Sequence, residues 1–160
     1  MVSSRARFVA IPVLMAVAAS AALLAASGDN RARGASTQQQ AECSESNATI
    51  VGTRSADEIK GTRGRDVIQA KAGNDVILAR GGRDLICGAR GRDYVAGGNG
   101  SDTIFGGRDG DALNGGRGRD RLRGSFGEEF LIGGRGFDRG RGGPDNDMCI
   151  RIEVAKQCEN

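Results

Sequence analysis

The sequence predicts an all-β protein folded as a parallel β-solenoid, with two nonapeptide units in each turn and about five and a half turns. Three observations predict this fold. Acidic residues recur at every ninth position from Asp57 to Asp147, without insertion or deletion. A large aliphatic residue follows two positions after nearly every acid. Of the 27 glycines, 25 lie between residues 52 and 143, so the glycine excess belongs to the repeat.

The repeat unit has the form G-G-x-G-x-D-x-U-x, where U is a large aliphatic residue. Its glycine-rich half predicts a turn, because that half needs positive φ angles that only glycine adopts cheaply. Its x-U-x half predicts a very short strand with one inward side chain. The acidic positions are Asp57, Asp66, Asp75, Asp84, Asp93, Asp102, Asp111, Asp120, Glu129, Asp138 and Asp147. The inward positions are Ile59, Ile68, Ile77, Ile86, Val95, Ile104, Leu113, Leu122 and Leu131, followed by Gly140 and Cys149.

The composition excludes several classes of function. Histidine is absent and aromatic residues make up 4% of the 160-residue chain, which removes His-based triads, His-ligated zinc and imidazole bases. The formal charge is +3, from 23 basic and 20 acidic residues, and such a balance gives little support for nucleic-acid binding. No nucleophile elbow, phosphate-binding loop or paired-carboxylate pocket stands out. We therefore expect a monomer that is not an enzyme and has no nucleic-acid partner.

Residues 1–27 have the pattern of a signal peptide. Arg5 and Arg7 precede an apolar run that ends in small residues, and the expected cleavage point follows Ser27. An uncleaved membrane anchor is the alternative, because the run is nearly long enough to span a bilayer. Cleavage would leave a secreted, extracellular protein without a stable membrane span. The expected order is then a disordered polar leader (28–48), the solenoid (49–150) and a C-terminal cap (151–160).

Every second unit stacks on the same edge of such a solenoid, which sorts the acids into two columns. One column holds Asp66, Asp84, Asp102, Asp120 and Asp138, and the other holds Asp57, Asp75, Asp93, Asp111, Glu129 and Asp147. Carboxylates stacked about 5 Å apart repel each other. Carboxylates and turn carbonyls together offer the oxygen ligands that Ca²⁺ prefers. A calcium ion between neighbouring turns would remove the repulsion and stabilise a solenoid whose core is thin.

The nonapeptide resembles the hemolysin-type calcium-binding repeat of RTX proteins over residues 50–150, about 100 of 160 residues. The opening ATIVGT at residues 48–53 is similar to the first rung of small secreted bacterial members. The resemblance implies a parallel β-roll in which the first six residues of each unit bind Ca²⁺ through the Asp carboxylate and backbone carbonyls. Members exported by the type I route carry a C-terminal signal, whereas this chain has the N-terminal pattern described above. We expect a calcium-binding β-roll whose folding is coupled to the ion.

The two edges keep the repeat pattern unequally. The first column keeps its Asp, and the glycine two positions before it, in all five units. In the second column Ser55 and Asp109 occupy glycine positions and Glu129 replaces Asp, so that residues 75–111 keep the pattern best. The metal-ligand candidates are therefore Asp66, Asp84, Asp102, Asp120 and Asp138, with Asp75, Asp93 and Asp111 on the second edge.

Arginine occupies variable positions where the family often has Asn, Asp or small residues. Six arginines stand at the third position before an acid: Arg54, Arg63, Arg90, Arg108, Arg117 and Arg135. Four stand directly before an acid: Arg65, Arg83, Arg92 and Arg119. These side chains could pair with the Asp columns and replace the cation. Alternatively they point outward and only weaken calcium binding by a repulsion that salt would screen. The first alternative gives a calcium-free solenoid held by Arg–Asp ladders.

Four cysteines in an exported chain suggest two disulfides. Cys149 and Cys158 flank the last strand-like run, so their pairing would cap the C-terminal end. Cys43 precedes the first rung and Cys87 ends a strand in the fourth unit, so their pairing would fix the leader to the first turns. Three pairings are possible, and we favour this one. A four-cysteine metal site is disfavoured, because no C-x-x-C occurs and the positions are far apart.

A late basic cluster comprises Arg117, Arg119, Arg121, Arg123, Arg135, Arg139 and Arg141. The cluster could contact a surface polyanion, which defines an alternative function as a calcium-independent interaction module. The opposing interpretation, which we favour, is a solvated face on which interleaved carboxylates offset the positive charge. No aromatic ladder accompanies the cluster, which counts against single-stranded nucleic acid.

Overall fold

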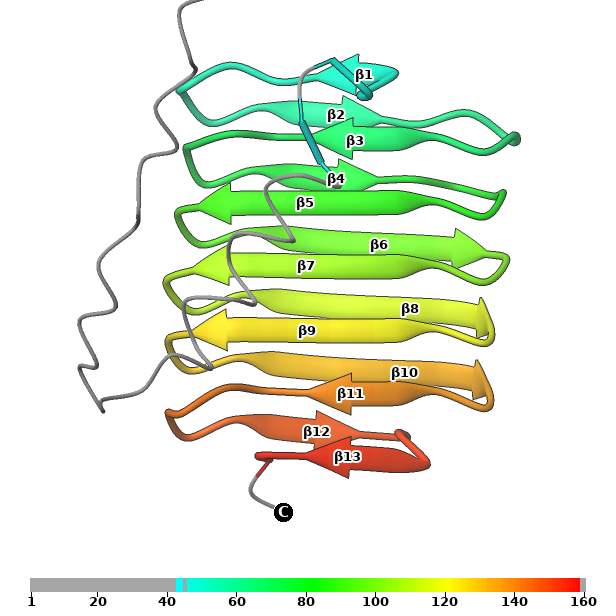
Figure 1. Cartoon of the computed structure of the whole chain (residues 1–160), viewed down its shortest axis with the longest axis vertical. Helices are drawn as coiled ribbons and strands as arrows, with labels where there is room; N and C mark the ends of the chain where they lie inside the picture. The colour runs from blue at the N-terminus through cyan, green and yellow to red at the C-terminus, as the bar shows by residue number, and fades with distance from the viewer. Residues whose placement is uncertain (1–42, 45, 159–160) are drawn as a thin grey trace, which may run out of the picture.

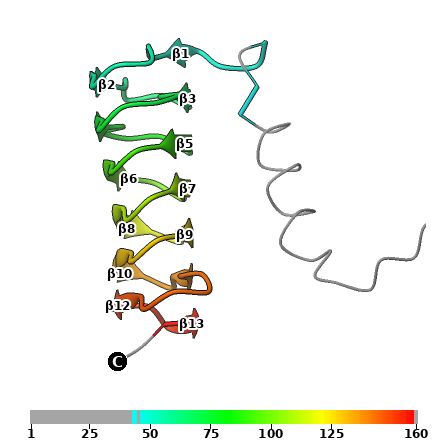
Figure 2. The same cartoon turned by 90° about the vertical axis from the view of Figure 1, so that its left-hand side faces the viewer.

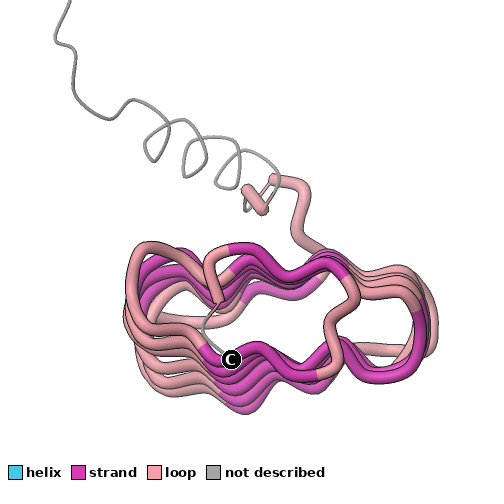
Figure 3. Tube along the Cα trace, turned by 90° about the horizontal axis from the view of Figure 1, so that it is seen from below, coloured by secondary structure: helices cyan, strands magenta, loops and turns pink. Residues whose placement is uncertain are grey.

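The computed structural model is a flattened solenoid whose two long sides are parallel β-sheets joined by turns (Figures 1 and 3). The structure describes residues 43–44 and 46–158. The expected signal peptide and most of the expected leader therefore lie outside the described residues. Within those residues there is no helix, and so none long and apolar enough to cross a membrane. The all-β solenoid predicted from the repeat is confirmed.

The strands alternate between the two sheets, as Figure 2 shows along the rod. The odd sheet contains β1 (Ile50–Val51), β3 (Val67–Gln69), β5 (Leu85–Arg90), β7 (Thr103–Arg108), β9 (Arg121–Phe126), β11 (Arg139–Arg141) and β13 (Val154–Lys156). The even sheet contains β2 (Glu58–Lys60), β4 (Val76–Leu78), β6 (Tyr94–Asn99), β8 (Ala112–Gly118), β10 (Phe130–Gly136) and β12 (Met148–Ile150).

Except for β11 and β13, neighbouring strands in each sheet pair in a register of 18 residues, so that Ile68 lies opposite Ile86 and Ile77 opposite Val95. One coil is therefore two nonapeptides, as the spacing predicts. The solenoid has about six turns instead of five and a half. The difference arises at the ends, because β1 precedes the first acidic unit and β13 follows the last.

The core consists of two columns of aliphatic side chains, one under each sheet, at the position two residues after each acid. Ile59 is 7% exposed, and the exposure of the eight that follow, from Ile68 to Leu131, is 0–2%. Their depth is one side chain per sheet, so the core is as thin as the sequence predicts. Val76, Tyr94 and Met148 project from the even sheet on the opposite side and stay 41–53% exposed.

The C-terminal cap closes the rod by breaking the register. Gly140 occupies a core position and leaves room that the side chain of Ile152 fills. β13 pairs with β11 so that Gly140 lies opposite Ala155, which makes the last coil fifteen residues long instead of eighteen. The shorter coil brings Glu153 to the place of the next acid, where its Oε2 accepts a hydrogen bond from the Asp138 amide. The cap therefore completes both the core column and the acidic column.

Two disulfides tie the ends to the solenoid, in the pairing favoured from the sequence. Cys43 is bonded to Cys87, and both are buried at 2% and 6% exposure. The bond fixes the segment before β1 to the outer side of β5, 44 residues along the chain. Cys149 is bonded to Cys158 across nine residues, so it joins the end of the cap to β12.

Replacing Ile152 with Ala should lower the free energy of unfolding by about 1–3 kcal/mol, because the change reopens the space beneath Gly140. Ile150→Ala is the matched control, since Ile150 is 40% exposed on β12, and it should change stability by only about 0.5 kcal/mol. Urea titration followed by circular dichroism measures both. Equal losses in the two variants would contradict the proposed role of Ile152 in the cap.

Candidate metal sites

The acidic residue of every unit after the first is buried. The ten residues from Asp66 to Asp147 in this position are 0–5% exposed, although each is charged at neutral pH in its ordinary state. Sequence periodicity predicts that these residues stack, but it does not predict that they are shielded from water. The burial follows from the turn geometry, which in most units folds the carboxylate back over the glycine five residues before it; Ala70 and Ala79 take that place before Asp75 and Asp84.

In eight of the acids one carboxylate oxygen joins successive coils. The backbone amide of an acidic residue donates to Oδ1 of the acid 18 residues later, at 2.8–3.0 Å. On the first edge these amide donors are Asp66, Asp84, Asp102 and Asp120, and on the second they are Asp57, Asp75, Asp93 and Glu129. This Oδ1 ladder runs the length of both edges, with one gap at Glu129, whose two oxygens have no hydrogen-bond partner.

The second carboxylate oxygen is left without a hydrogen-bond partner while buried. This holds for Oδ2 of Asp75, Asp84, Asp93, Asp102, Asp111, Asp120, Asp138 and Asp147. A buried charged oxygen without a partner is costly, because it has lost water and gained nothing. Such atoms need an explanation, and a bound ion is one of the few available.

Backbone oxygens approach the same places as the unpartnered Oδ2 atoms. A methyl group added to Gly97 would lie 2.6 Å from Oδ2 of Asp102 and 2.8 Å from the carbonyl oxygen of Gly115 in the next coil. Gly115 has the same environment, with Oδ2 of Asp120 at 2.5 Å and the carbonyl oxygen of Gly133 at 2.8 Å. Glycine is required here because any side chain would collide with these oxygens. A carboxylate and a carbonyl side by side suit a hard cation.

Carboxylates alone do not make the site. Across residues 43–44 and 46–158, no three Asp, Glu or Cys side chains gather closely enough to hold a metal ion by themselves. A cation between coils would therefore rely on one or two carboxylates and on backbone carbonyls. This donor set matches the ligand preference of Ca²⁺, which takes six to eight oxygens and accepts carbonyls.

Burial raises the pKa of the stacked acids. The pKa of Asp102 and of Asp120 rises to about 6, that of Asp93 to about 7 and that of Asp111 to about 8. Glu129 has the largest shift, to a pKa of about 9, from burial and from the carboxyl of Asp147. Desolvation is the main cause in each case, and repulsion between neighbouring acids adds to it. Burial also raises the pKa of Asp75, Asp84 and Asp138.

The first two units differ from all later ones. Oδ2 of Asp57 accepts hydrogen bonds from the Thr53 amide at 2.6 Å and from the Thr53 hydroxyl at 3.0 Å. Thr62 makes the same pair of bonds to Oδ2 of Asp66, at 2.7 and 3.0 Å. The oxygen that is unpartnered in later coils is thus satisfied by the protein itself. Asp66 was expected to be a ligand like the others, and the structure gives its Oδ2 a different partner.

The later units lose this threonine cap because their backbone turns differently. The position four residues before the acid has a positive φ at Lys71, Arg80 and Ala89, and at glycines in most units after them. Thr53 and Thr62 do not have a positive φ, since a β-branched residue is strongly disfavoured there. The threonines could be seen in the sequence, but their role as caps depends on this change in the turn.

The arginines beside the acids point outward. All ten arginines three positions or one position before an acid are exposed. The unpartnered Oδ2 atoms show that these guanidinium groups do not neutralise the acids, because an Arg–Asp ladder would supply hydrogen bonds to them. The outward alternative therefore holds, and the Arg–Asp ladder does not form.

The second edge keeps the same carboxylate geometry beyond residues 75–111, the part that the sequence favours. Asp109 adopts a φ of 74° at a glycine position, and its Oδ2 accepts a hydrogen bond from the Gly91 amide in the preceding coil. The acidic column continues through Glu129 to Asp147, which has a buried, unpartnered Oδ2 like the others. The nine-residue spacing places Glu129 and Asp147 in this column, although the residues around them depart from the repeat pattern.

Fold and site together define a repeat protein that buries a column of carboxylates along each edge of a β-solenoid. Four copies of the RTX calcium-binding nonapeptide repeat match the chain, at residues 51–86, 60–95, 88–122 and 108–140. These copies cover more than half of the chain, and the protein belongs to this calcium-binding family. No curated protein and no solved structure gave a significant match.

In EDTA, the melting temperature should fall as the pH rises from about 5 to about 9. The raised pKa values make the folded state bind more protons than the unfolded chain above pH 4, so the stability present in acid is lost as pH rises through 6 to 9. Thermal melts followed by circular dichroism at pH 5, 7 and 9 measure the slope.

A matched pair of variants locates the source of that pH dependence. Asp111→Asn removes a buried acid with a pKa of about 8 and should flatten the dependence near that pH. Glu128→Gln removes an exposed acid of the same edge and should leave the slope unchanged. A melting temperature that is constant or rises with pH in EDTA would contradict the assignment of buried, unneutralised acids.

Proposed function

We propose that this protein is an exported, non-catalytic calcium-binding β-roll whose folding is coupled to Ca²⁺ held between stacked turns. One observation carries the proposal: eight buried Asp Oδ2 atoms have no partner, and seven of them lie within the residues that match the calcium-binding repeat. When bound, calcium would supply the positive charge that the acids lack. The chain supplies Oδ2 and carbonyl oxygens, while Oδ1 stays in the ladder between coils.

The proposed ligands on the first edge are Asp84, Asp102, Asp120 and Asp138, and on the second they are Asp75, Asp93, Asp111, Glu129 and Asp147. We leave Asp57 and Asp66 out, because Thr53 and Thr62 already satisfy their Oδ2 atoms. These two units would then form a metal-independent end from which the calcium-dependent coils continue. The Cys43–Cys87 disulfide supports such an end, since it joins the segment before β1 to β5.

Coupling to folding follows from the electrostatics. Without a cation, the folded state holds like charges in a poorly solvated column, which lowers its stability at neutral pH. An ion that binds only the folded state stabilises it by about 2.7 kcal/mol per site at a hundredfold excess over Kd. RTX repeats are typical of extracellular proteins, where calcium is plentiful. Export through an N-terminal signal peptide would bring the chain from a calcium-poor compartment to a calcium-rich one.

Asp102→Asn should have opposite effects with and without calcium. Asn keeps an oxygen for the amide of Asp84 but removes the buried charge and the Oδ2 ligand. In EDTA at pH 7.5 the melting temperature should rise by a few degrees, roughly 2–5 °C. In millimolar calcium it should fall below that of the native protein by about 5–10 °C. Thermal melts and a calcium titration by circular dichroism measure both effects.

Asp66→Asn is the matched control, because it lies in the same column but is capped by Thr62. It should leave the number of bound calcium ions unchanged in isothermal titration calorimetry, whereas Asp102→Asn should reduce it. Superimposable melts of the native protein in calcium and in EDTA would refute calcium-coupled folding. Equal loss of calcium in both variants would refute the metal-independent end alone.

A further inference from the structure

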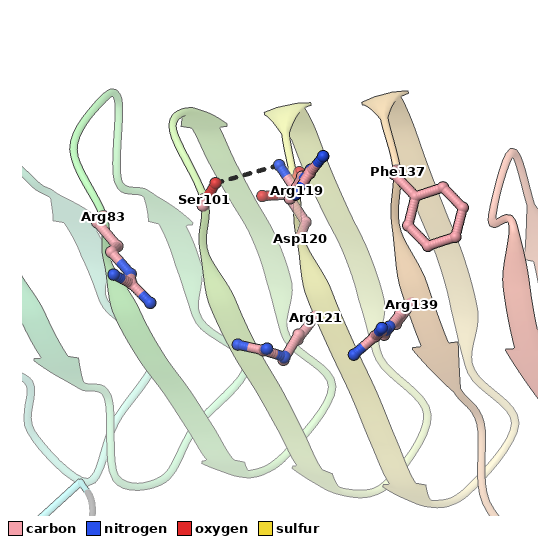
Figure 4. A pocket seen from close by; sticks show the side chains of 7 residues that line it. All are labelled: Arg83, Ser101, Arg119, Asp120, Arg121, Phe137 and Arg139. Carbon is pink, nitrogen blue, oxygen red and sulfur yellow. Dashed lines mark hydrogen bonds between the residues drawn. The ribbon is translucent and has the colours of Figure 1, made fainter.

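A basic hollow lies on the first edge of the solenoid, outside the acidic column. It has a volume of about 460 Å³ and is lined by Arg83, Ser101, Arg119, Asp120, Arg121, Phe137 and Arg139 (Figure 4). Apart from Asp120 itself, the lining comes from two repeat positions, directly before the acid and directly after it. Four successive coils contribute, so the hollow follows the rod over about 15 Å.

Positive charge in the hollow is not offset at the surface. Its one acid, Asp120, is 1% exposed, and its Oδ1 is engaged by the Asp102 amide of the neighbouring coil. No carboxylate among residues 43–44 and 46–158 is paired with any of the four guanidinium groups. Arg121 and Arg139 lie opposite each other on β9 and β11 and are both exposed, so two like charges are held on adjacent strands.

The surrounding surface carries mostly the same sign. On this edge Arg63, Arg65, Arg117 and Arg135 are exposed beside the hollow. Three exposed acids of the middle and lower coils, Asp109, Glu128 and Asp145, lie on the opposite edge, and Glu153 of the cap is the exposed acid next to Asp138 on the first edge. The sequence favours a face on which acids offset the arginines. The structure differs, because the interleaved acids point into the solenoid and the arginines point out.

We propose that this hollow binds the phosphate or sulfate groups of a linear polyanion. Guanidinium groups form paired hydrogen bonds with such oxyanions. Tetrahedral groups can take donors from several directions, as the arginines of neighbouring coils would supply, whereas a carboxylate takes them in one plane. The repeat of charge along four coils fits a chain of anions better than a single ion. Phe137, 49% exposed, offers an apolar contact for the spacer between anionic groups.

Calcium strengthens this binding, a corollary that rests on the proposed function. Asp120 lies at the hollow and is a proposed calcium ligand, so each cation in its column adds positive charge behind the arginines. The coupling is reciprocal, and the polyanion must raise calcium affinity by the same factor. A coupling of about threefold to tenfold is expected for charges separated by several ångströms near a protein surface.

Fluorescence anisotropy with the disulfide-intact protein tests the hollow. The probes are fluorescein-labelled inorganic polyphosphate of about 20 phosphates and labelled dextran sulfate, with poly-glutamate of matched charge as comparator. At least one of the first two should bind about tenfold more tightly than poly-glutamate, and the tighter one identifies the anion. Binding should weaken with added salt. Equal binding of all three polymers would overturn the assignment to tetrahedral anions.

Arg121→Gln/Arg139→Gln should weaken binding of the preferred polymer about tenfold. The matched control is Arg90→Gln/Arg108→Gln, a pair of exposed arginines also in register on adjacent strands of the odd sheet, at the opposite edge. That control should change binding less than twofold. Equal effects of the two double variants would show that affinity follows net charge and would overturn the hollow as a site.

The two proposals fail separately. If arginine-dependent binding is the same in calcium and in EDTA, the hollow stands and its coupling to calcium is refuted. If calcium changes the melts as expected but Arg121→Gln/Arg139→Gln binds the polymer normally, the calcium-binding function stands and the hollow is refuted. Circular dichroism of both double variants in calcium controls for folding, because all four arginines are exposed.

Discussion

The hydrogen bond from the amide of one acidic residue to Oδ1 of the acid one coil later is the interaction on which the rest of the structure depends. It sets the coil at 18 residues, aligns the two sheets and draws each carboxylate out of water. The same geometry leaves Oδ2 buried without a partner. The hydrogen bond that joins the coils therefore leaves a buried carboxylate oxygen without a partner. A cation that prefers oxygen ligands suits such an atom.

The two ends of the rod depart from the repeat in different ways. At the start, Thr53 and Thr62 supply hydroxyl and amide donors to the two acids that begin the columns. At the finish, the coil is shortened to fifteen residues, so that Glu153 continues the ladder and Ile152 fills the space beside Gly140. Both ends are covalently tied by disulfides. Only the N-terminal end satisfies the second oxygen of its acids from within the protein, since Oδ2 of Asp138 and of Asp147 stays without a partner at the C-terminal end.

The solenoid also separates charge by depth. Acids of each turn lie inside and arginines outside, so the nearly balanced sequence produces a surface that is far from balanced on the first edge. A cation bound to the inner column would add to the outer positive charge instead of cancelling it. The proposed calcium binding and the proposed anion binding would therefore be linked through a single column of carboxylates, with Asp120 common to both.

By itself the sequence determined the solenoid, its 18-residue coil, the two acidic columns, the core positions and the favoured disulfide pairing. These features follow from an uninterrupted nine-residue period, because every coil repeats the same local contacts. Only the tertiary structure decided which acids retain an unpartnered oxygen, how Thr62 caps Asp66, and how Ile152 compensates for Gly140. It also decided which side of each turn is buried, which turned an interleaved row of Arg and Asp into an acidic interior and a basic hollow. The period of the sequence determines which residues stack on one another. The burial of each side chain and the closure of the two ends arise from contacts between coils, which a single repeat unit does not contain.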